Sequence, residues 1–74
     1  MKLAKRITDR TAELAVAIRR NPPNLSDLYA AAHTHIHRLR YDAHLAFLDG
    51  KQARARALDR EAFAMARHVP VEYR

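Results

Sequence analysis

The stretch between Pro23 and Gly50 places the strongest constraint on how this chain can fold. Pro22 and Pro23 precede it, and Gly50, the single glycine of the chain, follows it. Proline lacks an amide hydrogen and restricts the residue before it, so a helix arriving from the N-terminal side must end before Pro22. The sequence therefore predicts one long helix over about residues 25–49, roughly 36 Å in length at about 1.5 Å per residue.

Apolar side chains recur through this stretch with the spacing of one helical face. At about 100° per residue they form a single stripe: Leu25, Leu28, Tyr29, Ala32, Ile36, Leu39, Ala43 and Phe47. A stripe of this length needs other apolar surface to cover it, and a 74-residue chain without cysteine offers little. We therefore expect a homodimer formed through the stripe of the central helix.

Shorter helices are expected on either side. Residues of about 2–20 predict a first helix, with Thr11 in a gap of its apolar face, and residues of about 51–68 predict a third helix. Their expected inner faces are Leu3, Ile7, Leu14 and Ile18 in the first, and Leu58, Ala62, Met65 and Val69 in the third. Pro70 ends the third helix, and residues 70–74 are expected to be a loose tail.

The connection around Gly50 decides how the second and third helices are arranged. Asp49 and Gln52 have the spacing of a capping box for the third helix, and Gly50 suits either a left-handed helix end or a tight helix start. A short connection favours an antiparallel αα-hairpin over one continuous rod. The predicted fold is all-α, a single domain of residues 1–74, with helices two and three as the hairpin.

The net charge of +6 and the pI near 10.5 indicate an acidic partner, such as a protein surface, nucleic acid or anionic lipid. The absence of cysteine excludes disulfides and thiolate metal sites. The sequence shows neither a secretory signal nor an apolar run long enough to cross a bilayer. We expect a cytoplasmic protein that does not interact with membranes.

One face of the third helix combines positive charge with an aromatic ring. Arg56, Arg60 and Arg67 fall within about 40° of one another, with Phe63 among them, opposite the apolar stripe of this helix. Guanidinium groups beside an exposed aromatic ring suit an acidic protein surface. We interpret these four residues as a partner-binding face. The alternative is a solvated face whose Phe63 packs against the first helix or a second subunit.

Nucleic acid is the alternative partner. In that interpretation Arg56, Arg60 and Arg67 contact phosphates together with a basic N-terminal cluster formed by Lys2, Lys5, Arg6 and Arg10. The central helix is too long for a helix-turn-helix, and other DNA-binding patterns match only weakly.

Histidines border the apolar stripe of the central helix. His33 and His37 have the i, i+4 spacing that can chelate a metal ion, and a hairpin could bring His68 near them as a third ligand. Without a carboxylate on that face, we favour histidines that border the core or a subunit interface, and we expect no bound metal or cofactor. A histidine-based metal or pH sensor is the second alternative function.

Catalysis is not expected from this chain. A single glycine permits no phosphate-binding loop, Ser26 is the one serine, and no carboxylate pair has catalytic spacing. The sequence therefore predicts a small, non-enzymatic interaction or regulatory protein of the phage, plasmid or bacterial accessory type. It would dock its basic helical face on an acidic protein.

Overall fold

The computed structural model describes residues 7–74, which form three α-helices and one short 3-10 helix. The elements are α1 (Ile7–Arg19), α2 (Leu25–Leu48), α3 (Gln52–Ala66) and η1 (Val71–Tyr73). No strand occurs among residues 7–74, so the expected all-α class is confirmed. The predicted residues Lys2, Leu3, Lys5 and Arg6 lie outside the described part of the chain.

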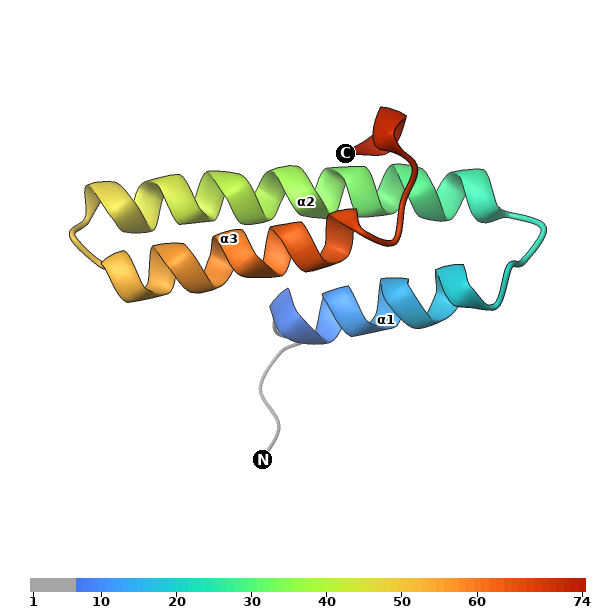
Figure 1. Cartoon of the computed structure of the whole chain (residues 1–74), viewed down its shortest axis with the longest axis horizontal. Coiled ribbons are helices and arrows are strands. Elements are labelled where there is room, and N and C mark those ends of the chain that lie inside the picture. Colours follow the sequence, from blue (N-terminus) through green and yellow to red (C-terminus); the bar gives the residue numbers. More distant parts are fainter. Residues whose placement is uncertain (1–6) are drawn as a thin grey trace.

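The long helix α2 is the element against which the other elements pack. Figure 1 shows α1 beside the N-terminal half of α2, and α3 returning along α2 from its C-terminal end to beyond its middle. The contact between α2 and α3 is the most extensive, that between α1 and α2 is smaller, and α1 meets α3 only slightly. The C-terminal half of α2 therefore has one helical neighbour where the N-terminal half has two.

Helix α1 is followed, two residues after its end, by a residue in the left-handed region. Asn21 has φ 51°, and its N–H donates to the carbonyl of Ile18 at 3.0 Å. Asparagine tolerates this conformation better than most residues with a Cβ atom. Pro22 then prevents the helix from continuing, so the chain crosses to α2 through a short connection.

Gly50 ends α2 rather than starting α3. It has φ 80°, its N–H donates to the carbonyl of Phe47, and the N–H of Lys51 donates to the carbonyl of Ala46. This pair of hydrogen bonds is the Schellman arrangement at a helix C-terminus. Asp49 is accordingly the C-cap of α2, and α3 begins after Lys51 without a side-chain capping bond. The capping box that the spacing of Asp49 and Gln52 indicates does not form.

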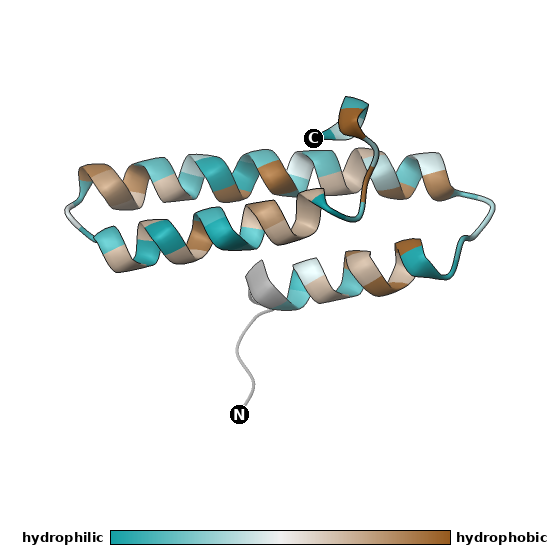
Figure 2. Ribbon diagram, in the orientation of Figure 1, coloured by the Kyte–Doolittle hydropathy of each residue, from teal (hydrophilic) through white to brown (hydrophobic). Residues whose placement is uncertain are grey.

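The core lies between α2 and the two helices that flank it. From the predicted stripe it contains Ala32, Ile36, Leu39 and Ala43, which are at most 3% exposed. Ala46 of α2 and residues from the neighbouring helices complete it: Leu14, Ala15 and Ile18 of α1, and Ala55, Leu58, Ala62, Met65 and Ala66 of α3, with Val69 beyond them. Figure 2 shows hydrophilic and hydrophobic residues interspersed along the ribbons of α2 and α3, as expected for amphipathic helices. The middle of the stripe is thus covered within the chain and is not available to a second copy.

Two residues of α2, Phe47 and His35, differ in burial from what the predicted stripe implies. Phe47, predicted to lie on the buried stripe, is 59% exposed, because the facing turn of α3 offers only small or polar residues such as Gln52 and Ala55. His35, which is not part of the predicted stripe, is buried at 8% exposure. Its Nε2 lies 2.7 Å from Oγ1 of Thr11, the polar residue in the gap of the α1 face.

The C-terminal residues are packed and not loose, contrary to expectation. Residues Val71–Tyr73 form the η1 turn, which contacts α2. The rings of Tyr29 and Tyr73 are 5.2 Å apart between centroids, and Nδ1 of His33 lies 2.9 Å from the carbonyl oxygen of Tyr73. The ring of Tyr73 gives this short segment an apolar contact that sequence pattern alone did not reveal.

Candidate partner-binding face

The predicted partner-binding residues occupy the outer side of α3. Arg56, Arg60 and Phe63 lie within the helix and Arg67 is its C-cap; all four are exposed, with Phe63 at 66%. Around the axis of α3, Phe63 is about 60° from Ala66, the nearest edge of the buried face. The ring therefore stands beside the core without contributing to it, and the three guanidinium groups lie on its other flank.

A groove between α2 and α3 continues this face. It is lined by Arg40, Ala43, His44 and Phe47 of α2 and by Gln52, Ala55, Arg56 and Asp59 of α3. Phe63 follows Asp59 by four residues, so it lies on the same side of α3, one turn beyond the groove. We call the surface formed by Arg40, His44, Phe47, Arg56, Arg60, Phe63 and Arg67 the Phe47–Phe63 face.

Three members of this face were missed by sequence reasoning. Arg40, His44 and Phe47 have the i, i+4, i+7 spacing of one helical side. That spacing is a usable signal, but it is obscured because Phe47 also fits the predicted apolar stripe. The Phe47–Phe63 face thus has one phenyl ring on each helix, with Arg40 and Arg56 on facing helices between them.

The C-terminal segment adjoins one end of the groove. Nη1 of Arg40 donates to the carbonyl oxygen of Arg74 at 3.3 Å, and Nε of Arg74 donates to the carbonyl oxygen of Val69 at 3.0 Å. These bonds hold the last residues beside α2. Arg40 therefore lies between the packed tail and the open groove.

The residues expected for nucleic-acid binding do not come together as one surface in the described chain. Arg10 pairs with Glu13 at 3.3 Å, and its charge acts on His35 together with that of Glu61. Glu61 lies about 140° around α3 from Arg56. Arg10 is thus on a different side of the molecule from the arginines of α3, and Lys2, Lys5 and Arg6 lie outside the described residues.

The candidate metal ligands are only partly brought together. The rings of His33 and His37 are 4.4 Å apart between centroids, but Nδ1 of His33 is engaged with the carbonyl of Tyr73. His68 does not join them: within residues 7–74, no three His, Asp or Glu side chains are grouped to hold a metal ion.

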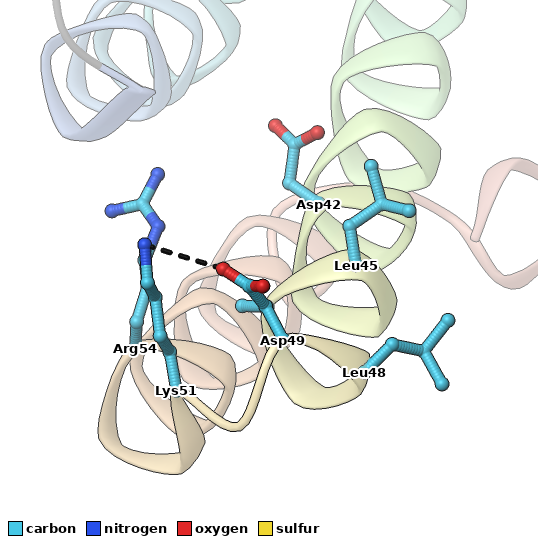
Figure 3. A pocket seen from close by; sticks show the side chains of 7 residues that line it. Asp42, Leu45, Leu48, Asp49, Lys51 and Arg54 are labelled. Carbon is cyan, nitrogen blue, oxygen red and sulfur yellow. Dashed lines mark ion pairs between the residues drawn. The ribbon is translucent and has the colours of Figure 1, made fainter.

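A second groove lies at the same end of the molecule. It is lined by Asp42, Leu45, Ala46, Leu48 and Asp49 of the α2 end and by Lys51 and Arg54 at the start of α3. Figure 3 shows Leu45 and Leu48 projecting from α2 away from α3, and an ion pair between Lys51 Nζ and Asp49 Oδ2 at 3.4 Å. Sequence reasoning did not identify this surface, since Leu45 and Leu48 lie off the predicted stripe.

Comparison with protein families, curated proteins and solved structures finds no match to this chain. Within the described residues, the helices lack the combination of length and apolar character needed to span a membrane.

Proposed function

We propose that this chain is a small, non-enzymatic docking protein that binds an acidic, amphipathic helix of a protein partner on the Phe47–Phe63 face. The observation that supports it is the exposure of two phenyl rings, at 59% and 66%, beside a groove that also carries Arg40 and Arg56. Aromatic side chains and arginine are enriched in protein–protein interfaces, where buried aromatic and arginine residues act as anchors.

The antiparallel αα-hairpin of α2 and α3 is the proposed recognition unit. A partner helix lying between two helices would bury Phe47 against one edge and Phe63 against the other. Full burial of an exposed phenylalanine side chain contributes about 1.5–3 kcal/mol, so the two partly exposed rings would supply only part of the binding free energy, and the other contacts of the face must add to it. The arginines then select for carboxylates on the flanks of the partner helix.

The composition of the face favours a protein over a nucleic acid. The groove contains Asp59 beside Arg56, and its carboxylate would repel phosphates and a partner's carboxylates alike, so the preference for a protein comes from the two phenyl rings. The two rings are carried by different helices, whereas a row of cations alone would suffice for phosphate contacts. Nucleic-acid binding through Arg56, Arg60 and Arg67 is the competing proposal, and the same experiment distinguishes the two.

Fluorescence anisotropy with three labelled probes tests the proposal. The probes are a helical peptide with leucines on one face and glutamates on its flanks, the same composition scrambled, and a random-sequence DNA duplex. We expect binding of the amphipathic peptide, weaker binding of the scrambled one, and loss of the difference in Phe47→Ala and Phe63→Ala.

The outcomes have distinct meanings. DNA binding that weakens steeply with salt, and that is reduced by Arg56→Glu and Arg60→Glu but not by Phe63→Ala, would establish the nucleic-acid alternative. Equal binding of both peptides would show that only charge is recognised and would overturn the proposed helix groove. Absence of binding to all three probes would overturn the docking function itself.

A further inference from the structure

The side of α2 that faces away from the core carries an apolar row. Tyr41, Leu45 and Leu48 have i, i+4, i+7 spacing and are 62%, 45% and 67% exposed. They lie roughly opposite Leu39 and Ala43 around the helix axis. Phe47 lies about 100° or more from each member of the row, and His44, about 40° from Leu48, is the residue of the Phe47–Phe63 face nearest to it.

Charged residues accompany this row on one flank only. Arg38 and Asp49 lie within about 20° of one another around α2, and both are exposed. Asp42 lies on the same flank, and the adjoining groove adds Lys51 and Arg54. The surface therefore presents both signs of charge in comparable amounts, unlike the chain as a whole with its net charge of +6.

Two pairs of these residues, Tyr41 with Leu45 and Arg38 with Asp49, are nearly symmetric about one point of α2, whereas Leu48 and Asp42 have no matching counterpart at the mirrored position. The midpoint between Tyr41 and Leu45 is position 43, and the midpoint between Arg38 and Asp49 is position 43.5, half a residue away. When two identical helices pack antiparallel, residues on the same flank of each helix meet across the twofold axis. Pairing about this point sets each Tyr41 against the other copy's Leu45, and each Arg38 against the other copy's Asp49.

We propose that this face of α2 pairs with a second copy of the chain about a twofold axis near Ala43. The occupant is a second copy because the charge pattern is complementary to itself in the same register that pairs the apolar side chains. In this dimer, Asp49 would form an ion pair with Arg38 of the second copy in place of its exposed intrachain ion pair with Lys51. The Phe47–Phe63 face stays open in such a dimer, so the inference stands independently of the proposed docking function.

The extent of the face sets the strength of the association. A stable interface buries about 800 Å² on each partner, and three apolar side chains with two ion pairs fall below that. The dimer is therefore expected to dissociate on dilution. Sedimentation velocity of the full chain over a wide concentration range should show a shift from monomer to dimer.

Charge reversal across the proposed axis provides the decisive test. Arg38→Glu alone and Asp49→Arg alone place like charges opposite one another, so each variant should sediment as a monomer where the wild type dimerises. An equimolar mixture of the two variants should form a heterodimer, since both cross-axis pairs are then opposite in sign. The double variant Arg38→Glu with Asp49→Arg should recover the dimer for the same reason.

Matched controls separate a dimer contact from a folding defect. Val71→Ala, at an exposed apolar residue outside this face, should leave the association unchanged, and circular dichroism should show native helix content in every variant. Leu45→Glu should abolish association. Monomeric wild type at all concentrations, or a dimer that withstands both single reversals, would overturn the proposal, as would a mixture that does not reassociate.

Discussion

Oγ1 of Thr11 and Nε2 of His35 lie 2.7 Å apart and form a hydrogen bond that joins α1 to α2 inside the packed region. Burial of the imidazole lowers the pKa of His35 below its ordinary value of 6.5, and the nearby charge of Arg10 lowers it further. The charge of Glu61 opposes this shift, and that of Arg38 reinforces it. The folded chain thus favours neutral His35 at the interface between α1 and α2.

The stability of the fold should decrease on mild acidification because of His35. Its pKa is lower in the folded state than in the unfolded state, so its contribution is fully present above pH 6.5 and is lost as the pH falls from 6.5 through the lowered folded value. Urea unfolding at about pH 7.5 and about pH 5.5 measures the difference. His35→Gln should flatten this dependence, while His44→Gln, an exposed control, should not. An unchanged slope in His35→Gln would contradict the assignment.

The hydroxyl of Thr11 should contribute more to stability than an ordinary helix-surface hydroxyl. Thr11→Val keeps the shape of the side chain but leaves a nitrogen of buried His35 without this partner, which costs about 1–3 kcal/mol. Thr34→Val removes a hydroxyl from an exposed position of α2 and should change the unfolding free energy by only about 0.5 kcal/mol or less. Equal effects of the two substitutions in urea titrations would show that the Thr11–His35 bond adds nothing.

His35 and Phe47 show where the sequence was sufficient and where it was not. One apolar stripe per helix correctly located Ile36, Leu39 and Ala43, because a 3.6-residue period fixes which side chains share a face. The N-terminal half of α2 has two helical neighbours, however, so its buried arc widens to include His35. Near the C-terminal end of α2, the facing residues of the alanine-rich α3 have side chains that are too small to cover the ring of Phe47. These differences arise from how the helices pack against one another, and the periodicity of a single helix carries no information about that packing.

The same distinction applies to the candidate surfaces: some of their residues could be predicted from the period of one helix, and others only from the packing of two helices. The exposure of Arg56, Arg60, Phe63 and Arg67 follows from the period of α3 alone, and the structure places all four at the surface. The contribution of Arg40, His44 and Phe47 requires α2 and α3 to lie side by side, so it emerges only from the folded chain. The packing of the C-terminal segment likewise emerges only from the folded chain, since the contact between Tyr29 and Tyr73 joins residues distant in sequence.

Gly50 should be required for its backbone conformation and not for space. A Cβ atom added at this position would meet nothing within 4 Å, but φ of 80° is strained for residues with a side chain. Gly50→Ala should therefore reduce the free energy of unfolding by about 1–2 kcal/mol, the usual cost of a left-handed L-residue. Gly50→Asn, which tolerates this region better, should cost less. Equal losses for both variants in urea titrations would indicate a steric cause instead.

Phe47 and Phe63 should be nearly dispensable for folding, and this separates their role from that of the core. Because the two rings are 59% and 66% exposed, they bury little apolar area in the folded chain. Phe47→Ala and Phe63→Ala should therefore leave the melting temperature close to that of the wild type. Met65, fully buried two residues after Phe63, provides the matched contrast, because Met65→Ala leaves a cavity and should cost about 2–5 kcal/mol. Differential scanning fluorimetry of the three variants compares them directly.

A loss in Phe63→Ala as large as that in Met65→Ala would mean that the ring stabilises the fold, and the Phe47–Phe63 face would then lose its main support as a docking surface. A neutral result leaves two large apolar side chains whose exposure the monomer does not require, which is the property expected of anchors for a partner.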